Sequence, residues 1–353
     1  MPTLDVSRRR GASGGDHRLI AWQRALLVLL MAALLGTIAG CGGANSASDG
    51  AADGGKKYRI AVIPKGTTHV FWKSVHAGAL QAARELGNVE IYWKGAILEN
   101  DREGQINVVA DFIAQGVDGI VLAPLDSTAL VPSVLDAKRE GIPTVIFDSG
   151  LADESVVVSY VATDNYRGGA LAAQEIGKRL GGKGNVILLR YNVGSESTEQ
   201  RERGFLETLK KEFPEIAVLS DDQYSGTTPL EAQNKALQLL NQFGDRLNGI
   251  FAVCEPDTVG VLGALEQEGL AGKVTFVGFD PSPHLVEAMA AGKIQGLVLQ
   301  DPVAMGYLGV KSIVAHLAGK PVEKRVNTGE TMATTENMRD AAIDKLLHPV
   351  LTD

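Results

Sequence analysis

The stretch PKGTTHVFW at 64–72 holds three side chains that could bind a polar, ring-shaped ligand: His69, Phe71 and Trp72. An apolar run, Tyr58–Ile63, precedes this stretch, and a helical pattern follows it. A strand, a polar loop and a helix in that order open an α/β unit, and ligands of open α/β sheets bind beyond the carboxyl ends of the strands. We therefore expect ligand contacts here. The alternative is that Phe71 and Trp72 only pack the first helix against the core.

Two aspartates occupy equivalent places in an internal repeat. The similar segments are VDGIVLAP at 117–124 with LNGIFAVC at 247–254, and GIPTVIFD at 141–148 with GKVTFVGFD at 272–280. Each half carries a strand, a helix and a second strand, and Asp148 or Asp280 leaves that second strand. Two such halves facing each other would direct both carboxylates into one cleft that closes by a hinge. The alternative is that each aspartate caps a following helix.

Apolar and amphipathic runs alternate along the body of the chain. The predicted strands are Tyr58–Ile63, Glu90–Trp93, Gly119–Ala123, Thr144–Phe147, Val156–Val161, Asn185–Leu189, Ala217–Leu219, Gly249–Val253, Val274–Phe279 and Gly296–Leu299. The predicted helices lie near Lys73–Leu86, Gln105–Gln115, Leu130–Glu140, Arg167–Leu180, Thr198–Phe213, Leu230–Phe243, Thr258–Glu268, His284–Ala291 and Val303–Ala318, with a weak pattern at Ala341–Leu351. This order predicts parallel sheets covered by helices on both faces. Because one compact sheet rarely holds so many strands, we expect two lobes.

The bulk composition is that of an ordinary globular protein and argues against several classes of ligand. The 353 residues are 45% hydrophobic and 22% charged, and the formal net charge is −8. A negative balance argues against nucleic acid or an anionic membrane surface as the ligand. The sequence has no zinc-ligand spacing and no cofactor motif, so we expect no metal and no cofactor.

Residues 1–40 have the pattern of an export signal. Several arginines precede an apolar run, Ala25–Leu35, that is too short to span a bilayer well. Small residues follow and end in IAGC, so we expect cleavage before Cys41. The segment 41–56 is rich in Gly, Ala, Ser and Asp and is expected to form a flexible tether. The alternative is an uncleaved membrane anchor.

Seven features of the body come in an order and spacing typical of one family. They are IAVIPKGTTHVFW at 60–72, GIVLAP at 119–124, PTVIFD at 143–148, ATDNYRGG at 162–169, RERGF at 201–205, VGFD at 277–280 and Gln300. Together they resemble the periplasmic sugar-binding proteins of ABC importers, close to the ribose-binding branch. The preceding IAGC resembles the lipobox of bacterial lipoproteins, in which the cysteine is lipidated and begins the mature chain.

The resemblance implies an α/β fold of two Rossmann-like lobes with parallel sheets, joined by a three-strand hinge. The first lobe would comprise 57–163 and 301–327, and the second 164–300 and 328–353. The implied crossings lie near Ala162–Asp164, Gln300–Asp301 and Asn327–Gly329.

The resemblance also implies a set of ligand contacts at matching positions. They are His69, Phe71, Trp72, Asp148, Ser149, Arg201, Tyr224, Cys254, Glu255, Asp280 and Gln300. Ser149 stands where the ribose-binding proteins have arginine, and Cys254 stands where asparagine is usual, so ribose itself is disfavoured. Other interpretations remain open at this stage. Tyr224 and Cys254 could be packing residues, Arg201 a surface ion pair on a helix, and His69 a solvated loop residue.

These residue types suit a sugar, because sugar hydroxyls both donate and accept hydrogen bonds. Ionised carboxylates only accept, and arginine only donates. Interleaving Asp148 and Asp280 with Arg201, His69 and Gln300 can satisfy both roles, and charge-assisted bonds are the stronger kind. The aromatic faces of Phe71 and Trp72 would cover the C–H surfaces of the sugar.

The resemblance implies capture without catalysis, and the sequence has no GxSxG, HExxH or CxxC motif. We expect a monomeric substrate-binding lipoprotein, periplasmic or at the cell surface and anchored by lipidated Cys41. It would deliver a monosaccharide or polyol to a membrane permease. One alternative is a binding protein that presents a sugar-like signal to a membrane receptor. Another is a glycosidase that uses Asp148 and Asp280 as its carboxylate pair.

Overall fold

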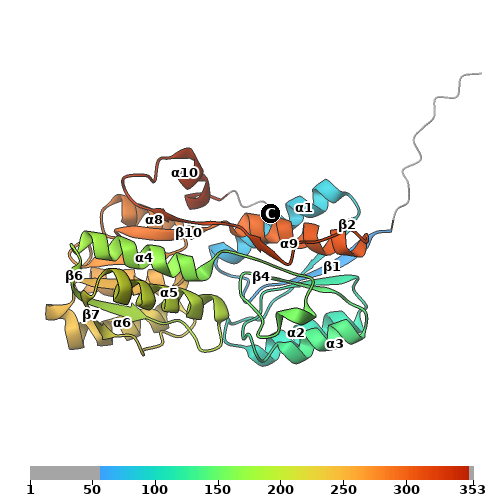
Figure 1. Cartoon of the computed structure of the whole chain (residues 1–353), viewed down its shortest axis with the longest axis horizontal. Helices are drawn as coiled ribbons and strands as arrows, with labels where there is room; N and C mark the ends of the chain where they lie inside the picture. The colour runs from blue at the N-terminus through green and yellow to red at the C-terminus, as the bar shows by residue number, and fades with distance from the viewer. Residues whose placement is uncertain (1–55, 350–353) are drawn as a thin grey trace, which may run out of the picture. The chain divides into compact units, whose positions relative to one another are not determined.

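The computed structural model describes residues 56–349, which lie within one compact unit of the chain. The export signal, Cys41 and most of the expected tether lie outside the described residues. Two six-stranded sheets, each covered by helices, form the described part (Figure 1). The predicted fold class, two α/β lobes with mainly parallel sheets, is confirmed.

The first sheet has the strand order β11-β5-β4-β3-β1-β2, and all its pairings are parallel. Its strands are β1 (Tyr58–Ile63), β2 (Val89–Trp93), β3 (Gly119–Leu122), β4 (Thr144–Phe147), β5 (Ser159–Ala162) and β11 (Arg325–Asn327). Its helices are α1 (Val70–Leu86), α2 (Arg102–Ala114), α3 (Val131–Arg139) and α9 (Pro302–Leu317). We call this sheet and its helices lobe 1.

The second sheet has the order β12-β10-β9-β8-β6-β7, and only β12 runs antiparallel to its neighbour. Its strands are β6 (Lys183–Leu189), β7 (Glu215–Ser220), β8 (Gly249–Ala252), β9 (Thr275–Phe279), β10 (Gly296–Gln300) and β12 (Glu330–Ala333). Its helices are α4 (Asn165–Arg179), α5 (Glu196–Glu212), α6 (Pro229–Phe243), α7 (Glu255–Gln267), α8 (Pro283–Ala290) and α10 (Ala341–Leu347). We call this sheet and its helices lobe 2.

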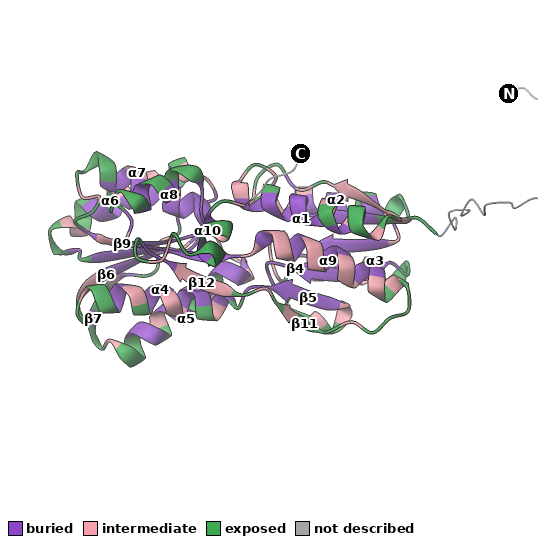
Figure 2. Ribbon diagram, turned by 90° about the horizontal axis from the view of Figure 1, so that it is seen from above, coloured by how far each residue is buried: buried purple, intermediate pink, exposed green. Residues whose placement is uncertain are grey.

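The apolar strands supply both faces of each sheet. In β1, Ile60 and Val62 pack with α1 and α9, whereas Ala61 and Ile63 pack with α2 and α3. This division follows from the alternation of side chains along a strand. Figure 2 shows the result, with buried strands between helices whose outer faces are exposed. A strand buried on both sides needs a continuous apolar run, which is why most strands could be predicted.

The chain passes between the two sheets three times. The passages lie between β5 and α4, between β10 and α9, and between β11 and β12. The strands involved, β5 with β11 and β10 with β12, lie at one end of each sheet order. The Thr163 hydroxyl donates to the Gly329 carbonyl over 3.1 Å and so ties two of these passages together.

Three local features differ from the predicted elements. The predicted strand Val156–Val161 begins only at Ser159, because Glu154–Val156 forms a short 3-10 turn in which the Asp153 carboxylate accepts from the Ser155 amide. Strands β11 and β12 were not among the predicted runs, because they are short and only partly apolar.

Among the described residues, the helices are all too short or too polar to cross a membrane.

Glycine pairs allow the two closest helix crossings. At the α1–α9 crossing, a Cβ on Gly78 would lie 2.0 Å from the Val303 carbonyl oxygen, and one on Gly306 would lie 2.0 Å from that of Val75. The α4–α5 crossing in lobe 2 uses glycines in the same way. Backbone at this separation leaves no room for a side chain, so each crossing depends on its glycines.

We predict that Gly78→Ala lowers the free energy of unfolding by about 1–3 kcal/mol, because the added methyl group must push α1 away from α9. Urea unfolding followed by tryptophan fluorescence measures this. Gly244→Ala is the matched control, since a Cβ there meets nothing within 4 Å and the φ of −47° suits alanine. Equal stability of the two variants would show that the crossing tolerates a side chain.

Candidate ligand-binding site

A pocket lies between the two lobes. Lobe 1 contributes Lys65, His69, Phe71, Trp72, Glu99 and Asp148, and lobe 2 contributes Tyr191, Ser197, Thr198, Arg201, Cys254, Glu255, Pro256, Asp280 and Gln300. Both lobes therefore contribute polar and aromatic side chains to one cavity.

Asp148 and Asp280 hold equivalent places in the two lobes, directly after β4 and β9. They are the only residues other than glycine with positive φ among the described residues, at 62° and 63°. Each amide still donates to the neighbouring strand, Asp148 to the Val161 carbonyl and Asp280 to that of Val298. This left-handed conformation is costly for a residue with a Cβ and is concentrated at functional sites.

Both aspartates line the pocket, as the internal repeat predicted. Neither is the N-cap residue of a helix: α8 is capped by Ser282, and the turn after Asp148 is capped by Asp153. The alternative interpretation of these residues as helix caps is therefore wrong. Asp148 Oδ2 lies 3.2 Å from Lys65 Nζ, and both Asp280 oxygens lie 3.0 Å from Gln300 Nε2.

Burial raises the pKa of Asp280 to about 7, although the nearby Arg201 guanidinium and the Gln300 amide favour the charged form. Gln300 itself is 1% exposed, and within the described structure its Oε1 atom has no hydrogen-bond partner. This corner of the pocket therefore has acceptors that are only partly satisfied by protein donors. A ligand hydroxyl that donates here would favour the ionised form of Asp280.

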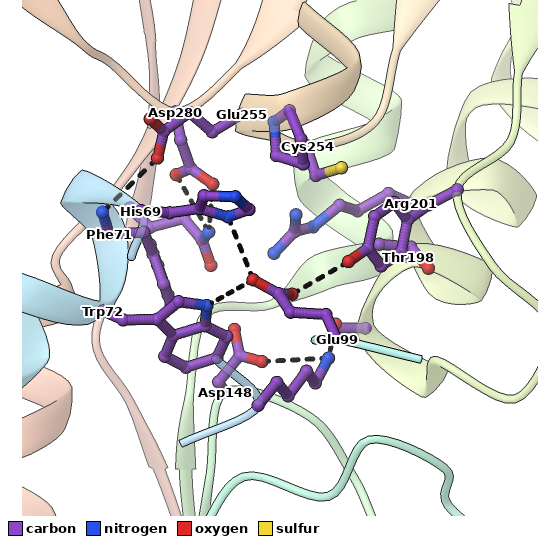
Figure 3. A pocket seen from close by; sticks show the side chains of 15 residues that line it. His69, Phe71, Trp72, Glu99, Asp148, Thr198, Arg201, Cys254, Glu255 and Asp280 are labelled. Atoms are coloured by element: carbon purple, nitrogen blue, oxygen red, sulfur yellow. Dashed lines mark hydrogen bonds and ion pairs between the residues drawn. The ribbon is translucent and has the colours of Figure 1, made fainter. Parts of the chain in front are cut away.

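Glu99 is the centre of a hydrogen-bond network that joins the two lobes (Figure 3). Its Oε1 atom lies 2.9 Å from His69 Nδ1 and 2.7 Å from Trp72 Nε1. Its Oε2 atom accepts from the Tyr191 hydroxyl of lobe 2 over 2.9 Å. Burial alone would raise the pKa of Glu99, but these donors outweigh it and lower the pKa. Burial likewise opposes the charged form of His69, but the Glu99 carboxylate raises the pKa of His69.

Arg201 is a buried residue of α5 whose guanidinium is held on several sides. Its Nε donates to Asn165 Oδ1 over 2.8 Å and its Nη1 to the Val253 carbonyl over 2.9 Å. The guanidinium carbon lies 3.8 Å from the centre of the Phe279 ring, which supports the plane from one side. With 2% exposure, Arg201 is no surface ion pair, and its fixed plane can present the remaining donors to the pocket.

The first turn of α7 brings Cys254 and Glu255 to the pocket. Cys254 is a buried free thiol, and burial raises its pKa well above the ordinary value, so it is a neutral lining group. Glu255 Oε2 accepts from the Phe71 amide of lobe 1 over 3.4 Å, and burial raises the pKa of Glu255. Among the described residues, no cluster of three or more histidine, cysteine and acidic side chains could hold a metal ion.

Phe71 and Trp72 lie at the boundary between the pocket and the apolar core of lobe 1. They line the pocket and also belong to the apolar cluster between α1, α9 and the first sheet. Their rings meet edge to face at a centroid distance of 4.8 Å. Packing against the core therefore fixes the ring orientations that a ligand meets.

Two predicted contacts lie elsewhere in the structure. Ser149 is fully buried outside the pocket lining, and its hydroxyl accepts from the Ser197 amide across the lobes. Tyr224 is 38% exposed and forms an isolated parallel β-bridge with Arg190 beyond the end of β6. The Arg190 guanidinium carbon lies 5.7 Å from the centre of the Tyr224 ring. The tyrosine of lobe 2 that lines the pocket is Tyr191, which follows Arg190 just beyond the end of β6. The other predicted contacts, from His69 to Gln300, all line the pocket.

Several lining residues were not predicted. They are Lys65, Glu99, Tyr191, Ser197, Thr198 and Pro256. Three of them, Lys65, Glu99 and Tyr191, follow the strands β1, β2 and β6. Ligands of parallel sheets bind beyond the carboxyl ends of the strands, so these positions were candidates. Lys65 and Glu99 belong to loops in which no residue pattern marks one polar side chain above its neighbours.

Two lobes with their strand ends facing one polar pocket define a two-lobed binding protein of the periplasmic type. The family model described as "Periplasmic binding protein domain" matches residues 60–321. The chain belongs to this family.

Named binding proteins are similar to this chain over most of its length. The xylitol-binding protein of Mycolicibacterium smegmatis is 31% identical over 236 residues, 67% of this chain and 66% of that protein. The D-allose-binding periplasmic protein of Escherichia coli is 30% identical over 275 residues, 75% of this chain and 87% of that protein. The crystal structure of a carbohydrate transporter solute-binding protein from Agrobacterium radiobacter with D-arabinose has a TM-score of 0.79 and 32% identity, covering 83% of this chain and 99% of that one.

We predict a pH dependence of stability that is specific to Asp280. The ordinary pKa of an aspartate is about 4, and in the fold it is about 7, so the folded protein binds an extra proton between these values. The stability of the wild type relative to Asp280→Asn should therefore fall by about 4 kcal/mol as the pH rises from about 4 to about 7, and stay level above that. Urea unfolding of both proteins across this pH range measures the difference.

Comparing the two proteins cancels other titrating groups, including Glu202, whose pKa burial raises to about 7. A difference in stability that does not change with pH would contradict the burial of Asp280 in its protonated form.

Proposed function

We propose that this protein is the substrate-binding component of an ABC importer and that it captures one neutral monosaccharide or polyol between its lobes. The observation that carries this proposal is the pocket itself, in which both lobes contribute carboxylates together with fixed donors and aromatic rings. The relatives support it, because the names of several state that they bind xylitol, ribose, D-allose or D-arabinose.

The distribution of donors and acceptors fits a polyhydroxylated ligand. Asp148, Asp280 and Glu255 retain acceptor capacity, and Arg201 retains donors beyond its two protein contacts. A hydroxyl can donate to one of these groups and accept from another, which neither a carboxylate nor an ammonium group can do. Because the groups are buried, a sugar that lacks one hydroxyl would leave a partner unsatisfied at a cost of about 1–3 kcal/mol.

The three passages between the sheets support a closing movement. They are short, they lie at one end of each sheet order, and the pocket lies between the lobes that they join. We propose that they act as the hinge, so that the ligand is enclosed when the lobes approach each other. We propose no chemical step: the bound sugar is passed on unchanged to a membrane permease.

We predict that a panel of xylitol, D-arabinose, D-fucose and D-allose contains a ligand that raises the melting temperature of residues 57–353. Calorimetry should confirm binding of one molecule, and small-angle scattering should show a smaller radius of gyration with this ligand than without it. NMR of the recovered ligand should show the starting sugar. A panel without binders, or a consumed sugar, would contradict the proposal.

Asp280→Ala provides the site control for this experiment. A bound hydroxyl favours the ionised form of Asp280, so removing this buried partner should weaken binding by at least about 30-fold. Asp245→Ala changes the same residue type at an exposed position of lobe 2 and should bind like the wild type. Equal affinity of the Asp280 variant would place the ligand elsewhere.

We also propose that the mature protein is a lipoprotein anchored through Cys41, on the basis of the export signal and the IAGC sequence at its end. We predict that Cys41→Ser moves the protein from the membrane fraction to the soluble fraction of cells. Continued membrane association of this variant would indicate an uncleaved anchor instead.

A further inference from the structure

Lys65 is a buried cation that the proposed ligand contacts do not use. It follows β1, and its side chain is 4% exposed. Its ammonium group lies 3.2 Å from Asp148 Oδ2, 3.2 Å from Ser195 Oγ and 3.1 Å from Ser197 Oγ. A lysine ammonium has three protons, so these three acceptors occupy all of them. Lys65 therefore has no donor left for a ligand.

The three acceptors belong to different lobes. Asp148 is in lobe 1 with Lys65, whereas Ser195 and Ser197 lie at the start of α5 in lobe 2. The neighbouring residue reinforces the contact, because Glu196 Oε2 accepts from the Gly150 amide of lobe 1 over 2.9 Å. With the lobes apart, Lys65 would keep only Asp148 among these partners, and water would have to replace both serines.

The position of the Lys65 ammonium group lowers the stability of helix α5 at its N-terminus. Ser195 is the N-cap residue of α5, but its side chain makes no capping bond and instead accepts from Lys65. A helix whose N-cap side chain makes no capping bond is less stable than a capped one. A cation near a helix N-terminus is also disfavoured by the helix dipole. Once the lobes separate, the Ser195 hydroxyl is free to cap α5.

We propose that Lys65 is a positioning residue that couples ligand binding to lobe closure, by bridging the ligand-facing carboxylate of Asp148 to the start of α5. We call the contacts of Lys65 with Asp148, Ser195 and Ser197 the Lys65 bridge. Because Lys65 takes Oδ2, it orients the carboxylate so that Oδ1 is left for a ligand hydroxyl. The orientation is complete only in the closed form, when both serines hold the ammonium group. This role rests on the proposed sugar-binding function.

The test uses Lys65→Met, Ser197→Ala and their combination, with the tightest-binding sugar of the panel as the probe. Lys65→Met should weaken binding at least about 30-fold, as expected for truncating one partner of a buried charge pair. Ser197→Ala leaves the Lys65–Asp148 pair intact and should weaken binding about tenfold, the loss of one hydrogen bond to a charged group. The combined variant should be no weaker than Lys65→Met, because both changes break the same bridge.

Kinetics separate coupling from a general loss of stability. The bridge forms only after the lobes close, so stopped-flow fluorescence should show a raised dissociation rate in both single variants with little change in the association rate. At saturating sugar, Lys65→Met should also keep a larger radius of gyration than the wild type. Lys94→Met is the matched control, since Lys94 is an exposed lysine of lobe 1 paired with Asp111; it should behave like the wild type.

Each other outcome overturns the proposal. Unchanged affinity of Ser197→Ala, or additive effects in the combined variant, would show that Lys65 acts without the second lobe. If Lys65→Met does not fold, Ser197→Ala alone decides, because it leaves no buried charge unpaired. If the wild type binds no sugar of the panel, the proposed function fails and the coupling role fails with it.

Discussion

The structure depends on carboxylates that are buried between the two lobes. Both lobes must supply the hydrogen-bond donors or cations that these carboxylates need. Asp148 and Asp280 leave equivalent strands with the same left-handed backbone, at φ values of 62° and 63°. A buried carboxylate is stable only with donors or a cation beside it, or as the neutral acid. Lobe 1 gives Asp148 a lysine, and lobe 2 leaves Asp280 with one amide and a pKa of about 7. The two aspartates are thus alike in backbone and different in the groups that surround them.

The remainder of the pocket follows from the same requirement. Glu99 collects donors from His69, Trp72 and Tyr191, so that it stays ionised in a buried place. Because one of these donors comes from the opposite lobe, closure completes its hydrogen bonds. Lys65, which carries a positive charge, likewise needs partners from the opposite lobe. In both cases a charged group of lobe 1 has all of its hydrogen-bond partners only when lobe 2 is in contact. A ligand would bind to the acceptors that have no protein donor.

Sequence reasoning predicted the fold well because each buried strand needs a continuous apolar run, as in Tyr58–Ile63 and Thr144–Phe147. The internal repeat brought Asp148 and Asp280 together for a physical reason: parallel strands place the residues that follow them at one edge. The short strands β11 and β12 escaped prediction because pairing with β5 and β10, and not their own composition, holds them in place. Glu99 and Lys65 escaped it because their roles arise from contacts between distant segments. Tyr224 was expected from the family resemblance alone, whereas the tyrosine that lines the pocket is Tyr191, which follows the inner strand β6.

The most direct test of the account is a crystal structure of the protein with the sugar that binds most tightly. We predict one sugar between the lobes, with hydroxyls within hydrogen-bond distance of both the Asp148 and the Asp280 carboxylates and Arg201 donating to the same ligand. A sugar held by one lobe alone, with the other aspartate facing solvent, would contradict it.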